Sequence, residues 1–487
     1  MKKQVCNTLV CLFLLSAALA QNTTDQLITE ALKPSPLATN LEQLTDQIGG
    51  RVPGTPAMEK AVQWGVDAFK AAGADSIHVE NFTIPTSWAE GATQMTVVAP
   101  ESFSVRAISL AWAPALTYRH KVRAVDVGAA NADDFANAGD VSGTILLVHS
   151  DEMKTWDDLF AEYLRAPGII DRAVEAKALA IAFQSTRLHD LLYRHTNSLP
   201  GEIDRLPEVL LAREDAARMA RLIASGQKLY ADLAVPNHIG GAIQSSNVVA
   251  ELRGSEKSDE FVVLGAHLDS WELGTGALDN GCNAVLVIDA LRAIKAAGLR
   301  PRRSIRFILF SGEEEGLLGS HAYVLAHRNE LERAAGVVVF DSGSGKVTGF
   351  SVGGRKDIIP AANKLVDPLK QFGADSLTAD MEWGTDHFDF MLEGVPTFTA
   401  NQQEANYLIN YHASSDTFDK VDLEQLKKHV AEAAALVFAL ADDPERIGPR
   451  LNRAQIQQNI EQTHFDGLMK TFGMWQAWQQ GKMGRAE

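Results

Sequence analysis

Cysteine is scarce in this 487-residue sequence, which has three, at positions 6, 11 and 282. Two of them fall in an N-terminal stretch that we expect to be removed, so Cys282 remains alone and no internal disulfide can form. Long hydrophobic runs are also lacking. After the N-terminal stretch, no run approaches the ~20 apolar residues that a helix needs to cross a bilayer. We therefore expect no membrane insertion.

Positive charge is in short supply as well. The sequence has 45 lysines and arginines against 62 aspartates and glutamates, for a formal net charge of −17. An acidic surface repels phosphate groups, which argues against nucleic acid and anionic membranes as partners. The charge balance favours solubility and says little about a small substrate.

The N-terminus has the pattern of a secretory signal peptide. Met1-Lys2-Lys3 precedes an apolar stretch that ends in Ala18-Leu19-Ala20, followed by Gln21. A short basic segment, an apolar segment and small residues at the end are the three parts of a cleavable signal. We expect cleavage before Gln21 and a mature protein that is secreted or periplasmic.

The rest of the chain predicts an α/β fold with a mostly parallel central sheet flanked by helices. Apolar, β-branched runs alternate with segments of helical periodicity, which is typical of parallel sheets. The texture changes in the middle of the chain to short strands and small helices, which indicates an inserted, smaller, β-rich α+β lobe. The predicted divisions are a signal peptide (1–20), one domain in two pieces (21–100 and 238–442), the lobe (101–237) and a helical C-terminal tail (443–487).

Four helices of the main domain are predicted from their apolar periodicity and their caps. They cover Ala57 to Ala72, Ala284 to Ala297, Gly316 to Arg333 and Asp422 to Leu440. Strands are predicted at Ile77 to Ile84 and at Met95 to Val98, before the texture changes.

The most informative stretch is an apolar run, Ile305 to Phe310, that ends in Gly312 and three consecutive glutamates, Glu313, Glu314 and Glu315. Three carboxylates at the end of a buried strand raise one another's pKa and need a positive partner. No lysine or arginine lies among the three glutamates or directly after them. A bound metal dication is the simplest explanation, with one glutamate left over as a base.

Two neighbouring apolar runs end in the same manner. The run from Phe261 to Gly265 leads to His267 and Asp269, and the run from Gly336 to Phe340 leads to Asp341. In an open α/β sheet, ligands bind beyond the carboxyl ends of the strands. The side chains at these three strand ends should therefore converge on one edge of the sheet.

Five residues along the chain have the right chemistry for a metal centre: His267, Asp279, Glu314, Asp341 and His412. Imidazole and carboxylate both suit zinc at neutral pH, and one imidazole with two carboxylates per ion, one of them shared, suits two zinc ions. Asp279 lies in a glycine-rich loop before a helix, where its two oxygens could bridge both ions.

Four motifs in this order resemble those of the co-catalytic zinc exopeptidases, the family that includes bacterial leucyl aminopeptidases, carboxypeptidase Q and glutamate carboxypeptidase II. The motifs are His267-Leu268-Asp269, Gly276-Ala277-Leu278-Asp279-Asn280, the segment from Gly312 to Ser320, and Tyr411-His412. The resemblance covers roughly residues 40 to 440. It implies a peptidase fold, two zinc ions per chain and, for the inserted lobe, a protease-associated domain.

The resemblance also implies a division of the metal ligands. His267 and Asp341 would bind one zinc ion, Glu314 and His412 the other, and Asp279 would bridge the two.

Further roles follow from the same resemblance. Glu313 would be the general base, and Asp269 would hold the His267 imidazole in one tautomer. Relatives have a cis peptide after the bridging aspartate, which makes Asp279-Asn280 a candidate. Tyr411 matches a tyrosine that hydrogen-bonds the tetrahedral intermediate in glutamate carboxypeptidase II.

The activity implied is removal of a terminal residue from peptides or dipeptides, as an aminopeptidase or dipeptidase. Two cations lower the pKa of a water between them and polarise the scissile carbonyl. The general base takes the proton of that water and returns it to the departing amine. By analogy with dimeric relatives, a homodimer is possible.

Other residues with reactive side chains have simpler interpretations. Glu315 is expected to be a solvated residue at a helix start, and Asp386 is a minor functional candidate near the substrate pocket. Cys282 is expected to be a small buried helix residue. Three histidines that fit no ligand position are expected to be structural or on the surface: His321, His327 and His387.

Two alternatives remain open from the sequence. A glutaminyl cyclase shares the fold and most ligands but works with one zinc ion. A receptor-like protein without catalytic activity would lose ligands and base, whereas all six positions are intact here.

Overall fold

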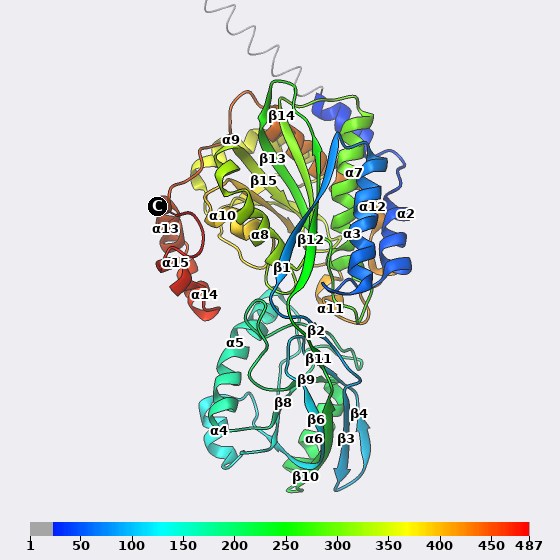
Figure 1. Ribbon diagram of the computed structural model, residues 1–487, viewed down its shortest axis with the longest axis vertical. Coiled ribbons are helices and arrows are strands. Elements are labelled where there is room, and N and C mark those ends of the chain that lie inside the picture. Colours follow the sequence, from blue (N-terminus) through cyan, green and yellow to red (C-terminus); the bar gives the residue numbers. More distant parts are fainter. Residues whose placement is uncertain (1–22, 487) are drawn as a thin grey trace, which may run out of the picture.

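The computed structural model describes residues 23–486. Its main domain is built on an eight-stranded sheet whose four central strands run parallel and are flanked on each side by an antiparallel strand (Figure 1). In spatial order the strands are β1 (Ser76–Ile84), β12 (Ile243–Leu252), β14 (Arg303–Phe310), β13 (Lys257–His267), β15 (Ala334–Val339), β18 (Thr397–Gln402), β16 (Val347–Ser351) and β17 (Ser376–Thr378). The predicted mixed α/β fold with a parallel centre is confirmed.

Helices cover both faces of this sheet, as its apolar central strands require. Along β13, Val262 and Leu264 face one helical layer, whereas Phe261 and Val263 face the other. The first layer contains α2 (Leu37–Glu42), α3 (Pro56–Ala72), α7 (Cys282–Ala296) and α12 (Leu423–Asp442). The second contains α8 (Leu318–Ala326) and α10 (His387–Leu392) (Figure 1).

The inserted lobe has a second eight-stranded sheet with its own apolar cores on both faces. In spatial order its strands are β4 (Phe103–Val105), β3 (Gln94–Ala99), β10 (Leu229–Val235), β6 (Leu116–Asp126), β7 (Ile145–Val148), β8 (Ala180–Gln184), β9 (Glu208–Leu211) and β5 (Ala107–Ser109). Its helices are α4 (Ala132–Ala138), α5 (Trp156–Glu175) and α6 (Arg213–Ala224). Figure 1 shows this lobe below the main domain.

The lobe begins earlier in the chain than residue 101, the boundary predicted from the sequence. β3 lies in the range that we assigned to the main domain, but it pairs with β10 and β4 in the sheet of the lobe. The two chain crossings between lobe and main domain lie at β2 (Trp88–Ala89) and β11 (His238–Ile239), which pair with each other. The strand was predicted correctly, and its sheet was not.

The C-terminal tail is helical and packs back onto the main domain. It contains α13 (Arg453–Gln462), α14 (Phe465–Thr471) and α15 (Met474–Gln479). Trp478 and Ile460 of the tail share an apolar cluster with Phe388 and Leu392 of α10. Within residues 23–486, no helix combines the length and the apolar character that crossing a bilayer requires. The predicted signal peptide, with Cys6 and Cys11, lies outside the described residues.

The helix predicted over Gly316 to Arg333 is divided in the structure. It starts late, as α8, because Gly316 and Leu317 have positive φ values of 106° and 63° and form the turn after β14. It ends at Ala326, and a 3₁₀ turn over Arg328–Arg333 leads into β15. The turn after β14, at Gly316 and Leu317, sets the direction of the three glutamates between β14 and α8.

Gly319 marks the closest approach of α8 to the end of β14. A Cβ atom at this position would lie 2.2 Å from the carbonyl oxygen of Ser311 and 2.4 Å from Oδ1 of Asn247. The Asn247 amide ties the two elements together, because it donates to the Gly319 carbonyl at 2.8 Å and accepts from the Ser311 N–H at 3.0 Å.

We expect Gly319→Ala to lower the free energy of unfolding by about 3 kcal/mol, since the added methyl group must push α8 away from backbone atoms. Gly467→Ala in α14 is the matched control, because no atom of the described residues lies within 4 Å of its Cβ position. That change should be neutral or stabilising by up to about 1 kcal/mol. Urea unfolding of both variants measures the difference, and equal stabilities would contradict the tight packing described.

Candidate metal centre

The ends of the parallel strands deliver the predicted side chains to one edge of the sheet. His267 is the last residue of β13, and Asp341 follows β15 by two residues. Glu313 and Glu314 lie in the turn between β14 and α8. Because β13, β14 and β15 are parallel neighbours, their carboxyl ends lie side by side.

Asp279 lies at the centre of the group. Its Oδ1 is 3.2 Å from Nε2 of His267, and its Oδ2 is 3.3 Å from Nε2 of His412. Two imidazoles from distant parts of the chain therefore face the two oxygens of one carboxylate. Asp279 lies in the irregular turn Ala277–Gly281 that leads into α7, and the Asp279-Asn280 peptide is cis, as the resemblance predicted.

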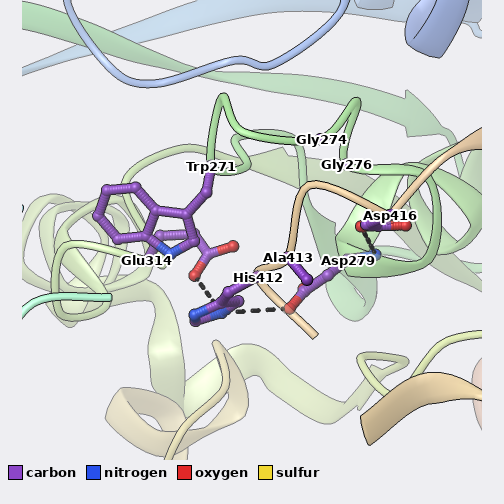
Figure 2. Close-up of a pocket in the computed structure, with 8 residues that line it drawn as sticks. All are labelled: Trp271, Gly274, Gly276, Asp279, Glu314, His412, Ala413 and Asp416. Carbon is purple, nitrogen blue, oxygen red and sulfur yellow. Dashed lines mark hydrogen bonds and ion pairs between the residues drawn. The ribbon is translucent and has the colours of Figure 1, made fainter. Parts of the chain in front are cut away.

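Each of the remaining carboxylates lies near Nε2 of one of the two imidazoles. Oδ1 of Asp341 is 3.1 Å from Nε2 of His267, and Oε2 of Glu314 is 2.8 Å from Nε2 of His412. Oε2 of Glu313 is 4.0 Å from Nε2 of His267. In Figure 2, dashed lines join His412 to Glu314 and to Asp279, and the indole of Trp271 lies nearby.

The side chains of this cluster titrate abnormally because they are buried together. Burial raises the pKa of Glu313 well above its usual value, and the charges of Asp341 and Glu314 act in the same direction. Burial likewise raises the pKa of Glu314 to about 7. Burial opposes protonation of His412, but the charges and hydrogen bonds of Glu314 and Asp279 together outweigh it and raise the His412 pKa to about 9.

The donor set fits divalent metal ions. Among the described residues, the ion pairs of the four carboxylates Asp279, Glu313, Glu314 and Asp341 involve histidine and neither lysine nor arginine. Two groups of residues each bring their ligand atoms within 4.8 Å of one another. One group is His267, Glu313 and Asp341, and the other is His267, Asp279 and Glu314. Imidazole with carboxylate oxygen is the ligand chemistry of zinc.

The His267 ring is oriented by Asp269, but in a different manner from the one expected. Nδ1 of His267 lies 3.1 Å from the main-chain carbonyl oxygen of Asp269, and 3.7 Å from its carboxylate. A carbonyl can only accept, so Nδ1 carries the proton and Nε2 is free for a metal. The Asp269 carboxylate instead accepts the main-chain N–H of Glu314 at 3.2 Å.

Three residues that sequence reasoning missed hold the Asp279 turn. The hydroxyl of Tyr407, in α11 (Tyr407–Asn410), donates to Oδ2 of Asp279 at 3.0 Å. Asp416 accepts the main-chain N–H groups of Leu278 and Asp279 at 2.7 and 3.1 Å (Figure 2). Their proximity to His412 in sequence was the available signal.

The third is Arg51, which is fully buried and donates to four main-chain carbonyls, two of which, those of Thr275 and Gly276, directly precede the turn. It comes from the Gly49–Pro56 loop, some 220 residues away in sequence, and its pKa is lowered to about 10 by burial. Because all its donors go to main-chain oxygens, Arg51 stiffens the turn without neutralising the carboxylates directly.

Tyr411 stands directly beside the metal-ligand candidate His412. Their rings are stacked with centroids 3.6 Å apart, and the Tyr411 hydroxyl lies 3.0 Å from the hydroxyl of Tyr163 in the lobe. Burial raises the pKa of Tyr411 well above its usual value, so the phenol keeps its proton and can donate a hydrogen bond.

The expectation for Glu315 was wrong. The residue is 2 % exposed and therefore not solvated, and burial followed by the charge of Asp269 raises its pKa well above the usual value. The positive φ values of Gly312 and Gly316 turn the three glutamates in different directions, so the third points inward. Asp386 is also fully buried, near enough for its charge to raise the pKa of Glu313.

The three histidines that fit no ligand position are structural, and Cys282 is a buried helix residue, as expected. His321 pairs with Asp389 at 2.7 Å, and His327 with Glu80 at 3.0 Å. His387 is buried, which lowers its pKa to about 4. Cys282 is buried in α7, and burial raises its pKa, so its thiol stays protonated.

Comparisons with known proteins agree with this geometry. Residues 247–437 match the model of peptidase family M28. Mouse carboxypeptidase Q is 26 % identical over 407 residues, which cover 83 % of this chain and 85 % of that protein. A peptidase M28 precursor from Shewanella amazonensis has the same fold, with a TM-score of 0.81 and 26 % identity over 90 % of this chain and all of that one.

A zinc aminopeptidase from Bacillus subtilis shares the fold at 20 % identity, with a TM-score of 0.65 over 86 % of this chain and 97 % of its own. Residues 247–437, which match the family model, contain all five ligand candidates and Glu313. The comparisons therefore identify the chain as a zinc metallo-exopeptidase that is similar to members of peptidase family M28.

Proposed function

We propose that this exopeptidase binds two zinc ions and uses them to release one terminal residue from peptides or dipeptides, as an aminopeptidase or dipeptidase. The observation that carries the proposal is the position of Asp279, whose two oxygens face the imidazoles of His267 and His412 at 3.2 and 3.3 Å. A carboxylate between two imidazoles is what a bridging ligand requires.

In this proposal each ion has one imidazole and one carboxylate of its own. His267 and Asp341 would hold the first, Glu314 and His412 would hold the second, and Asp279 would be shared. When bound, two zinc ions supply Lewis acidity, which activates a water and polarises the scissile carbonyl.

Glu313 is the proposed general base. It lies beside His267 and Asp341 but is not needed as a ligand in this arrangement. Burial and neighbouring carboxylates raise its pKa, which suits a group that must take a proton from water and give it to the departing amine. The Tyr411 phenol, protonated and close to His412, is placed to donate a hydrogen bond to the developing oxyanion.

Peptides or dipeptides are the proposed substrates, and export is the proposed location. The relatives include carboxypeptidase Q and a zinc aminopeptidase, so the direction of cleavage is a separate question from the chemistry. Export rests on the pattern of residues 1–20 alone.

The first prediction concerns Glu313. Glu313→Gln should lower kcat by about 10²- to 10⁴-fold, because it removes the proton acceptor, while zinc content stays as in the wild type. Glu315→Gln is the matched control. Its carboxyl has a strongly raised pKa, so an amide replaces a neutral group and activity should persist. A Glu313→Gln enzyme with wild-type kcat would contradict the assignment of the base.

The second prediction concerns the number of metal ions. Metal analysis of the purified chain should give two zinc ions, and chelation should abolish hydrolysis of aminoacyl anilides and dipeptides. One ion per chain, together with cyclisation of N-terminal glutamine peptides, would favour a glutaminyl cyclase instead.

The third prediction concerns pH. Without metal, His412 has a pKa of about 9 and is therefore protonated at neutral pH, whereas a zinc ligand must be neutral. Zinc binding at pH 7 should therefore release protons, and affinity should rise about tenfold per proton for each pH unit between pH 7 and 9. Calorimetry in buffers of different ionisation enthalpy measures this release, and a pH-independent affinity would contradict it.

A further inference from the structure

The segment that carries His412 is hydrogen-bonded to the inserted lobe through its main chain. The Arg194 N–H donates to the His412 carbonyl at 3.0 Å, and the Ser414 N–H donates to the Leu192 carbonyl at 3.1 Å. Tyr193 and Ala413 thereby form an antiparallel bridge. Although it belongs to the main domain by sequence, Ala413 is buried in an apolar cluster of the lobe.

Arg187 of the lobe reinforces this contact. Its Nη2 donates to the carbonyl oxygen of Tyr411 at 3.2 Å. The side chain is 3 % exposed, and its guanidinium lies 3.8 Å from the centre of the Tyr193 ring and 3.5 Å from Glu162. Arg187 is buried and contacts both the lobe and the main domain. It therefore holds the Tyr411 carbonyl in a fixed position relative to the lobe.

Two aromatic contacts connect the lobe to neighbouring residues of the same segment. The Tyr163 hydroxyl lies 3.0 Å from that of Tyr411. Trp156, at the start of α5, stacks on Tyr407 with centroids 5.5 Å apart. Tyr407 in turn donates to Oδ2 of Asp279. The lobe therefore supports both the His412 loop and a partner of the bridging aspartate.

This support matters because His412 lacks the restraint that His267 has. Nδ1 of His267 is held by a main-chain carbonyl, whereas Nδ1 of His412 is buried and has no hydrogen-bond partner among residues 23–486. The His412 backbone also has φ 59°, which is uncommon for a residue other than glycine. The direction of its imidazole therefore depends on what holds its backbone and on ring packing against Tyr411.

We propose that the inserted lobe is a positioning element of the metal centre. Through Arg187 and the Leu192–Arg194 segment it fixes the His412 backbone and so sets the affinity for the metal ion that His412 binds. The inference rests on the proposed two-metal function. It assigns a role to lobe residues that are not among the ligand candidates.

The test is a zinc titration of Arg187→Met, which keeps an unbranched stem but has no donor for the Tyr411 carbonyl. Competition with a chromophoric chelator resolves the two binding steps. We expect one step to weaken by about 10- to 100-fold, the range for loss of groups that orient a metal ligand. His412→Ala and Asp341→Ala each abolish one binding step and so assign the two steps. Arg187→Met should weaken the step that is lost in His412→Ala and leave the step that is lost in Asp341→Ala unchanged. Arg187→Lys, which restores a cationic donor, should recover part of the affinity.

Arg172→Met is the matched control, because that arginine donates to the carbonyl of Ala130 at 2.8 Å entirely within the lobe. Its two zinc affinities should equal those of the wild type. Thermal unfolding of the metal-free variants separates misfolding from loosening of the loop, and Arg187→Lys retains the charge beside Glu162 if Arg187→Met fails to fold.

Three outcomes would overturn the inference. A wild type that binds two ions, with Arg187→Met binding both at unchanged affinity, overturns it and leaves the proposed function intact. Equal weakening of both steps, or an equal effect of Arg172→Met, shows that Arg187 only stabilises the lobe. A wild type that binds a single ion overturns the two-metal function and the inference together.

Discussion

Charge repulsion among buried carboxylates at one edge of the parallel sheet is the constraint on which the structure depends. Asp279, Glu313, Glu314 and Asp341 meet where three strands end, and their ion pairs among the described residues are with histidines. Such a group is unfavourable in a dry interior unless positive charge compensates it. Zinc supplies that charge, so the arrangement that destabilises the empty site is also what gives the site its affinity.

The rest of the fold keeps these groups in place while the repulsion acts. Arg51 and Asp416 fix the Asp279 turn from opposite sides, one by donating to its carbonyls and the other by accepting its N–H groups. The lobe holds the segment that brings His412, which comes from outside the strand ends. The sheet therefore positions His267, Glu314 and Asp341, whereas the segment that carries His412 is hydrogen-bonded to the lobe.

Much of this was predictable from the sequence because strand ends and ligand chemistry are local features. The apolar runs before His267, Glu313 and Asp341 fix where these residues lie, since parallel strands share an edge. The direction of Glu315 was not predictable, because three adjacent acids give no sign of which one turns inward. The contact of Arg187 with the Tyr411 carbonyl was equally hidden, since it joins residues more than 200 positions apart and depends on how two bodies dock.

Anomalous X-ray diffraction at the zinc edge from crystals of the loaded enzyme tests the central claim most directly. The account predicts two peaks of similar height, about 3.5–4 Å apart, one on each side of the Asp279 carboxylate. A single peak, or a second peak that His412 does not contact, would contradict it.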